Sequence, residues 1–189
     1  MPVAPRPHVL GIDDGPFEKF SSETVPVVGV MMEGPDLVEA VALTRFPVDG
    51  DGVTEFLAGW VAGLRFRPAL RGIVLGGITL AGLAVVDPQE LARQSGVAVV
   101  VVNRRRPGNA RLAAALEAAG LPERRALLER APPAVALPGG LWASAAGTDA
   151  AGAAGLVRAT RLKSDLPEPL RLAHLIARAV ALGESRGRA

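Results

Sequence analysis

The stretch "VLGIDDGPF", residues 9–17, places an apolar segment directly before two adjacent carboxylates. Side chains of a β-strand point alternately to the two faces of a sheet, so Asp13 and Asp14 cannot both face the same site. The Gly-Pro pair that follows is typical of a turn. We therefore predict a strand that ends at this acidic pair, with one carboxylate free for chemistry and the other serving the turn.

The segments after this strand predict a meander followed by a helix. Two Val-rich runs, residues 25–33 and 37–48, are set off by Gly-Pro turn signals, which favours antiparallel strands joined by short connections. The acidic, glycine-rich "DGDG" at 49–52 then leads into "VTEFLAGWVAGL" at 53–64, whose apolar residues recur at helical spacing. We expect an amphipathic helix that starts near residue 52.

Downstream of this helix, strand and helix patterns alternate. The predicted elements are a strand at 70–77, a helix at 87–96 with Asp87 as its N-cap, a strand at 97–103, helices near 109–120 and 122–133, an edge strand within 134–147, a helix near 149–162, and a last helix after "DLPEP". This order of elements is that of an RNase H-like core. We expect one α/β domain over residues 1–189, with a mixed sheet of five to six strands and helices on both faces.

Composition narrows the classes of function. The chain has 189 residues, of which 49% are hydrophobic, and this is enough for a sizeable core. It has no cysteine, which excludes disulfides and thiolate metal sites, and a net charge of +2, which permits a nucleic-acid partner without requiring one. No run approaches the roughly 20 apolar residues of a membrane span. We expect no membrane contact and a cytoplasmic protein; the sequence leaves the oligomeric state open.

Carboxylates near the ends of the central strands suggest a metal site. In the expected topology, Asp13 and the residue at position 76 approach each other at one edge of the sheet, with the first helix lying over them. Converging carboxylates repel unless hard cations such as Mg²⁺ or Mn²⁺ hold them together, and such ions support phosphoryl displacement. The alternative is structural: an Asp-Asp-Gly-Pro turn, with Asp49, Asp51 and Glu55 only favouring the start of a helix.

Basic residues offer two interpretations as well. "NRRRP" at 103–107 follows a predicted buried strand, so Arg104 and Arg105 emerge at the sheet edge, where they either contact phosphate or form a solvated charge run. His174 lies three residues after Arg171 on the last predicted helix. It is either a structural hydrogen-bonding residue or a group at the edge of the site that transfers a proton or contacts phosphate.

An ordered set of motifs resembles one known family from about residue 9 to the C-terminus. The motifs are "VLGIDDGPF", "VPVVGV", "VDGDGVTE", "GITLAGLAVVD", "VVVVNRRRP" and "LPEPLRLAHLIARAVALGESRGRA". They look like those of the endonuclease dU family, formerly a domain of unknown function. That family in turn resembles endonuclease V, an RNase H-like, Mg²⁺-dependent enzyme that nicks nucleic acid near deaminated bases.

The resemblance implies roles for particular residues. "GID" at 11–13 resembles the strand that ends in the first metal-binding Asp of endonuclease V, which implicates Asp13. The acid of the first helix falls on Glu55, with Asp51 as the second choice. "LPEPLRLAH" at 166–174 resembles the C-terminal helix motif, which implicates Arg171 and His174.

One departure from the family pattern bears directly on catalysis. Where both families carry Asp-Gly at the end of the fourth strand, this chain reads "VLGGITLAG" at 74–82, and the expected carboxylate is replaced by Gly76. A metal ligand is then missing, unless Asp14, Asp49 or Asp51 takes its place. The chain also has no tyrosine, so the tyrosine wedge of endonuclease V has no direct counterpart.

Three functional hypotheses follow. The first is a divalent-metal-dependent endonuclease that acts on DNA, with deoxyuridine as the base implied by the family name and RNA left open. Its metal candidates are Asp13, Glu55, Asp51 and Asp14, its catalytic candidates Asp13, Glu55 and His174, and its phosphate contacts Arg104, Arg105 and Arg171. The second is a nucleic-acid-binding relative that has lost catalysis through Gly76. The third is an enzyme for a small phosphorylated substrate, which a fold alone does not exclude.

Overall fold

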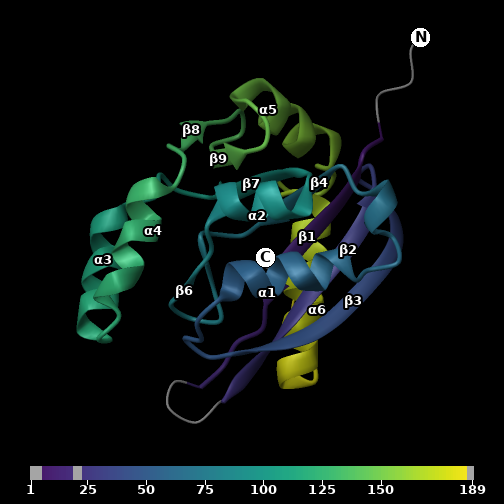
Figure 1. Cartoon of the computed structure of the whole chain (residues 1–189). Coiled ribbons are helices and arrows are strands. Elements are labelled where there is room, and N and C mark those ends of the chain that lie inside the picture. The colour runs from purple at the N-terminus through teal and green to yellow at the C-terminus, as the bar shows by residue number, and fades with distance from the viewer. Residues whose placement is uncertain (1–5, 19–22, 187–189) are drawn as a thin grey trace.

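The computed structural model describes residues 6–18 and 23–186, and its centre is a seven-stranded mixed sheet (Figure 1). In spatial order the strands are β3 (Leu37–Pro47), β2 (Thr24–Glu33), β1 (His8–Asp14), β4 (Gly72–Leu75), β7 (Ala98–Asn103), β9 (Trp142–Ala146) and β8 (Val135–Ala136). β1, β2 and β3 form the predicted antiparallel meander, and β1, β4 and β7 run parallel. The buried Val run of β7 thus forms the predicted internal parallel strand.

Helices cover both faces of this sheet, as predicted (Figure 1). The helices are α1 (Val53–Ala62), α2 (Pro88–Ser95), α3 (Asn109–Ala118), α4 (Arg125–Arg130), α5 (Ala150–Ala159) and α6 (Glu168–Leu182), with short 3₁₀ turns η1 (Arg67–Ala69) and η2 (Pro122–Arg124). α1 and α2 pack on one face, called the α1 face below. α5 and α6 pack on the other, the α6 face. Among the described residues, no helix combines the length and apolarity needed to cross a membrane.

The sheet has more strands than the five to six expected, because residues 134–147 form a hairpin instead of one edge strand. β8 and β9 pair antiparallel, and the N–H of Leu137 donates to the carbonyl of Leu141 across the turn. Gly139 and Gly140 in that turn have φ of 90° and 80°, a conformation that glycine adopts without strain. A further two-stranded sheet, β5 (Thr79–Leu80) with β6 (Ala84–Val85), was not predicted either.

Alternation along β1 assigns its two acids to opposite faces. Leu10 and Ile12 are buried against α1, whereas Val9 is buried on the face that carries Leu170 of α6. Asp13 therefore lies on the α6 face and Asp14 on the α1 face. The same alternation in β4, with Val74 on the α6 face and Leu75 on the α1 face, puts Gly76 on the same side as Asp13.

Gly11 allows α6 to lie directly on β1. A Cβ at this position would lie 2.2 Å from the backbone N of Leu170 and 2.2 Å from the carbonyl carbon of Pro169. Real Cβ atoms do not approach backbone so closely, so any other residue would push the start of α6 off the strand. The contact makes the docking of α6 depend on a glycine in the middle of a buried strand.

We expect Gly11→Ala to destabilise the fold by about 3 kcal/mol or more, since overpacking a tight interface costs about 1–3 kcal/mol and here the neighbour is backbone. Gly59→Ala is the matched control: it lies in α1 with no atom within 4 Å of the added methyl group, and alanine should raise stability by about 0.5–1 kcal/mol. Urea unfolding measures both. Equal stabilities of the two variants would contradict the role of Gly11.

Candidate functional site

The centre of the candidate site is a pair formed by Asp13 at the end of β1 and His174 in α6. His174 Nδ1 lies 2.8 Å from Asp13 Oδ2, although the residues are 161 positions apart. The other oxygen, Oδ1, accepts a hydrogen bond of 3.0 Å from the N–H of Asp14. A carboxylate accepts hydrogen bonds, so the proton of a neutral His174 belongs on Nδ1, which leaves Nε2 to accept a proton.

A pocket of about 220 Å³ opens beside this pair at the carboxyl ends of the parallel strands. Its lining comprises Asp13, Gly76, Val102, Asn103, Arg104, Leu166, Leu170 and His174. The carboxyl edge of a parallel sheet is where open α/β proteins bind their ligands. The pocket therefore joins a titratable pair, an amide and a guanidinium at the place where the fold favours a ligand.

Gly76 lies beside Asp13, as the expected topology predicts for this position. β1 and β4 pair in parallel with Ile12 opposite Leu75, so Gly76 is the residue beside Asp13. A Cβ added there would lie 3.7 Å from Asp13 Oδ1 and 3.5 Å from the side chain of Leu170, both ordinary contact distances. The site has room for a side chain at position 76, and a carboxylate placed there would face Asp13.

Asp14 serves the loop on the opposite face. Its Oδ2 accepts a hydrogen bond of 3.0 Å from the N–H of Ala81, a residue with φ of 49° just after β5. Burial of the carboxyl, together with the negative charge of Asp13, raises the pKa of Asp14 to about 6. The two acids have different environments, as the alternation rule predicts for adjacent strand residues.

Glu55 and Asp51 lie at the start of α1, on the α1 face, away from the lining of the Asp13 pocket. Glu55 is exposed in the first turn of the helix, and Asp51 forms an ion pair with Arg124. The sequence predicts the first helix over Asp13 and position 76, and this is wrong: α6 is the helix that covers them. The structure thus brings Asp13, Gly76 and His174 together and leaves Glu55 and Asp51 apart from them.

Arg124 organises this second group and was not singled out in the sequence. Its side chain is only 7% exposed, and it donates hydrogen bonds to the carbonyls of Leu83 and Asp49 and to the carboxylate of Asp51. Asp49 Oδ1 in turn accepts from the N–H of Leu83 at 2.7 Å. A buried guanidinium requires such partners, and here it ties the loop before α1 to the loop after β5. No sequence signal separates it from the other arginines of "PERRALLER".

The predicted phosphate-binding arginines have different surroundings. Arg104 and Arg105 are exposed, and Arg104 lines the Asp13 pocket. Arg106 lies over the ring of Trp142, 5.4 Å from its centroid, a cation–π distance. Arg171 donates two hydrogen bonds, of 2.8 and 2.7 Å, to Glu168 Oε2, so its charge is already paired inside the protein.

Asn103 is a site residue that the sequence reasoning passed over. It ends β7 and lines the Asp13 pocket and also a second pocket of about 340 Å³ that holds Arg106, Asn109 and Ser144. Its amide is therefore placed where the two pockets approach each other. The sequence signal that points to Asn103 is its place as the first residue of "NRRRP", at the carboxyl end of a buried strand.

The groups around Asp13 fit one divalent ion better than a preformed pair of ions. Among the described residues, Asp13 belongs to no group of three His, Asp or Glu side chains whose ligand atoms all lie within 4.8 Å of one another. Mg²⁺ is commonly held by one or two carboxylates, its remaining ligands being water and substrate phosphate. Asp13 supplies one such carboxylate, whereas Gly76 has no side chain that could supply a second.

Comparisons with solved structures show the same fold. A protein of unknown function from Archaeoglobus fulgidus superposes with a TM-score of 0.85 at 34% identity, covering 93% of this chain and 98% of that one. Endonuclease V from Streptomyces avermitilis superposes with a TM-score of 0.59 at 18% identity, covering 95% and 83%. Endonuclease V from Ciona intestinalis, solved with a 24mer DNA that contains an inosine, has a TM-score of 0.58 at 15% identity, covering 89% and 82%. The expected RNase H-like, endonuclease V-like fold is confirmed.

Sequence comparisons give the family. A UPF0215 protein from Methanothermobacter thermautotrophicus is 40% identical over 186 residues, covering 96% of this chain and 91% of that protein. A UPF0215 protein from Thermococcus kodakarensis is 41% identical over 190 residues, covering 97% of each. The sequence profile of the endonuclease dU family matches residues 5–181. With a match over nearly its whole length, this chain belongs to the endonuclease dU family.

Proposed function

We propose that this protein is a divalent-metal-dependent endonuclease that hydrolyses a phosphodiester of DNA beside a deaminated base, with deoxyuridine as that base. The observation that carries the proposal is the Asp13–His174 pair in a pocket at the carboxyl edge of the sheet. Membership of the endonuclease dU family and the fold shared with endonuclease V support the same reaction class.

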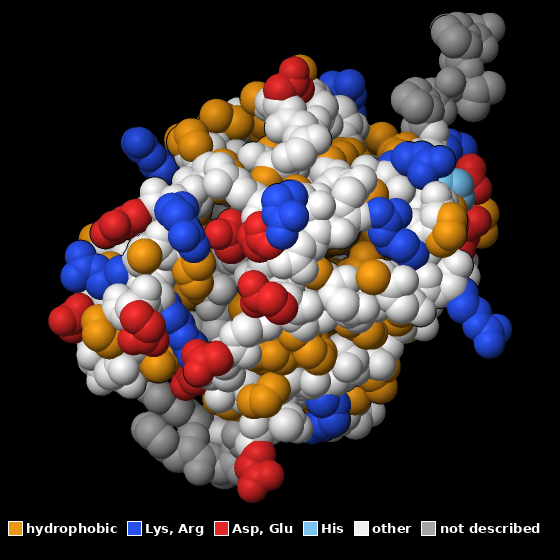
Figure 2. Space-filling model, viewed as in Figure 1, with side chains coloured by type: hydrophobic (Ala, Val, Ile, Leu, Met, Phe, Trp, Pro, Cys, Tyr) orange, Lys and Arg blue, Asp and Glu red, His pale blue; other side chains and the backbone are white. Residues whose placement is uncertain are grey.

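An exposed arginine beside the pocket supports a nucleic-acid ligand at this edge. Arg104 is exposed beside the pocket, and a guanidinium binds phosphate oxygens without reading sequence. On the face viewed in Figure 2, basic and acidic side chains are interspersed, and no broad basic surface forms there. The complex of the Ciona endonuclease V with DNA supports DNA as the ligand class.

In this proposal, Asp13 holds Mg²⁺ or Mn²⁺ and His174 moves a proton. The ion, when bound, would neutralise phosphate charge and favour attack by water. The hydrogen bond from His174 Nδ1–H fixes the orientation of the Asp13 carboxylate and of the imidazole ring. Nε2 is then the atom that exchanges a proton with the attacking or leaving oxygen. Glu55, Asp51 and Asp14 remain candidates for metal binding. They lie on the α1 face, however, whereas Asp13 lines the pocket, so Asp13 is the stronger candidate.

A second candidate function, DNA binding without cleavage, has one observation in its favour. Gly76 leaves the position beside Asp13 without a carboxylate, and loss of a metal ligand commonly removes most catalysis. The basic pocket edge would be retained in such a protein. The cleavage experiment below separates the two functions.

Metal-dependent nicking of a labelled duplex with one deoxyuridine is the expected activity of the wild type. Asp13→Asn should lower the cleavage rate at least about 100-fold, and His174→Asn by about 10²–10⁴-fold, the range for loss of acid–base catalysis. Asp149→Asn is the matched control, because Asp149 caps α5 and asparagine caps equally well. Its rate should equal that of the wild type.

Three outcomes of the cleavage and binding measurements would change the assignment. Cleavage that persists in Asp13→Asn would show that the reaction takes place elsewhere. No cleavage by the wild type, with cleavage gained in Gly76→Asp, would establish the binding relative. Binding and cleavage of duplex DNA both absent would favour a small phosphorylated substrate.

Arg104→Gln should weaken DNA binding and reduce its salt dependence. Removing one phosphate contact lowers the slope of log affinity against log salt concentration by about 0.9. Arg186→Gln is the control, since Arg186 is exposed near the C-terminus and pairs with Glu184. Fluorescence anisotropy measures the affinity at several salt concentrations between about 50 and 200 mM. A change of about 1 in the slope of log affinity against log salt concentration is large enough to detect over this range. Equal slopes for Arg104→Gln and the wild type would exclude the contact.

Asp14→Asn should flatten the pH dependence of stability in chelator-treated protein. The folded state raises the pKa of Asp14 from 3.8 to about 6, so it binds the proton more tightly than the unfolded state does. The contribution of Asp14 to the free energy of unfolding therefore falls as pH rises from about 4 to 6, by up to about 3 kcal/mol. Urea unfolding across this range measures the effect. A wild type and variant with parallel pH profiles would show that Asp14 does not titrate in this way.

A further inference from the structure

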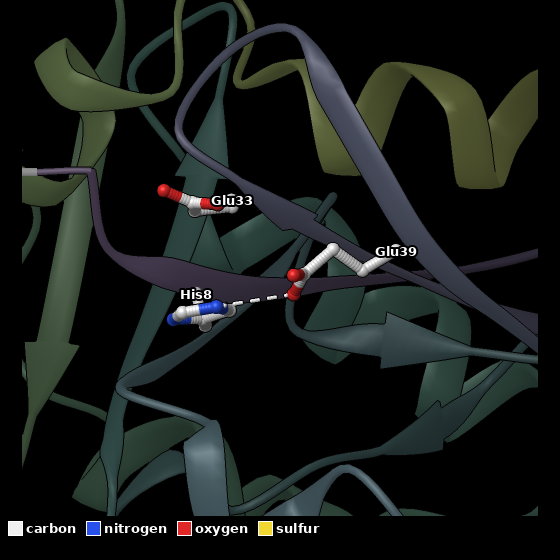
Figure 3. A group of neighbouring side chains, drawn as sticks. All are labelled: His8, Glu33 and Glu39. Atoms are coloured by element: carbon white, nitrogen blue, oxygen red, sulfur yellow. Dashed lines mark ion pairs between the residues drawn. The ribbon is translucent and has the colours of Figure 1, made fainter.

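Three side chains of types that can ligate a metal ion gather at the end of β1 opposite to Asp13, and Figure 3 shows how they lie. The cluster consists of His8 at the start of β1, Glu33 at the end of β2 and Glu39 in β3. His8 Nε2 is 3.1 Å from Glu39 Oε2, and one ligand atom from each of the three side chains lies within 4.8 Å of the other two. Within residues 6–18 and 23–186, it is the only group of this kind.

A β-bulge brings Glu39 into this cluster. His8 and Glu33 are direct cross-strand partners and share a face. Between β2 and β3, Ala40 is opposite Met31 but Val38 is opposite Met32, so Glu39 is the extra residue of a bulge. In a regular ladder Glu39 would be opposite Met32 and would point to the α6 face, where Met32 is buried. The bulge turns Glu39 toward His8 instead.

The cluster carries an excess of negative charge. Arg6 is shared between Glu33, at 3.3 Å, and Asp36, at 2.5 Å, while Glu39 pairs with His8. With a neutral imidazole, the side chains of Arg6, Glu33, Asp36 and Glu39 sum to a formal charge of −2. The side chains of His8, Glu33 and Glu39 are each about 30% exposed, so an ion from solvent reaches them directly.

We propose that His8, Glu33 and Glu39 form a binding site for a divalent transition-metal ion of the Zn²⁺ type. One imidazole nitrogen and two carboxylates are ligands that Zn²⁺ accepts, with water as the fourth, whereas Mg²⁺ prefers oxygen ligands only. Each ligand comes from a different strand of one rigid meander, so the ion joins β1, β2 and β3. The site is five residues from Asp13 along β1, roughly 17 Å at 3.3 Å per residue, and does not depend on the proposed nuclease function.

Titration of chelator-treated protein with Zn²⁺ alone, followed by calorimetry and thermal unfolding, tests the proposal. The wild type should bind one Zn²⁺ at this cluster, and Tm should rise by about 5 °C or more at a Zn²⁺ concentration a hundred times Kd. Glu39→Gln and His8→Asn should each weaken binding at least about tenfold and remove most of the rise in Tm. Arg6→Gln should tighten binding, because it releases Glu33 and removes a positive charge.

The control variant carries Asp13→Asn and His174→Asn together, since that pair is the other place where Zn²⁺ has a nitrogen and an oxygen ligand. It should keep the Zn²⁺-dependent rise in Tm. Loss of the rise in this control, its retention in Glu39→Gln, or no Zn²⁺ binding by the wild type would each overturn the proposal. Far-UV circular dichroism establishes that Glu39→Gln, an isosteric change on a partly exposed strand, is folded.

Discussion

The contact between Gly11 and the start of α6 determines where the functional groups lie. The backbone of Pro169 and Leu170 occupies the space that a side chain at position 11 would need. From this contact, two strand residues lead to Asp13, a rise of about 6.6 Å, and four helical residues lead from Leu170 to His174, a rise of about 6 Å. Because the two rises match, the carboxylate of Asp13 and the imidazole of His174 lie at the same height above the Gly11 contact. The hydrogen bond between them is a consequence of how closely helix and strand approach.

The carboxyl edge of the sheet is organised differently on its two faces. On the α6 face, the ionisable pair is accompanied by open space beside Gly76. On the α1 face, Asp14, Asp49 and the buried Arg124 are engaged in holding loops in place. Acids that look equivalent in the sequence thus have different roles. Asp13 lines a pocket, whereas the acids on the α1 face accept hydrogen bonds from backbone N–H groups or from the Arg124 guanidinium, which burial would otherwise leave without partners.

The fold was largely predictable because its signals are local or periodic. The Val-rich strands, the Gly-Pro turns, the N-cap at Asp87 and the helical spacing after residue 52 each specify an element, and the order of elements specifies the topology. The assignment of Asp13 and Asp14 to opposite faces followed from strand alternation alone. β8, and with it the β8–β9 hairpin, was missed because a strand of two residues carries almost no periodicity.

Features that depend on which elements become neighbours in three dimensions were harder to predict from the sequence. The sequence indicated that position 76 faces Asp13, but not that α6 rather than α1 covers them. Arg171 looked available for phosphate, yet it is paired with Glu168, a carboxylate only 4% exposed that also accepts from the N–H of Lys163. Neither the pairing of a buried charge nor the bulge at Glu39 leaves a pattern in the sequence, because both depend on which strands and helices become neighbours.

The separation of Asp13 and His174 along the chain links the candidate site to the order of folding. The meander of β1, β2 and β3 is built from contacts that are close in sequence, which form early at small entropic cost. The pair itself joins the first strand to the last helix across 161 residues, so it exists only after α6 has docked. The Asp13–His174 pair is therefore a late feature of folding, and partly folded chains in which α6 has not docked on β1 lack it.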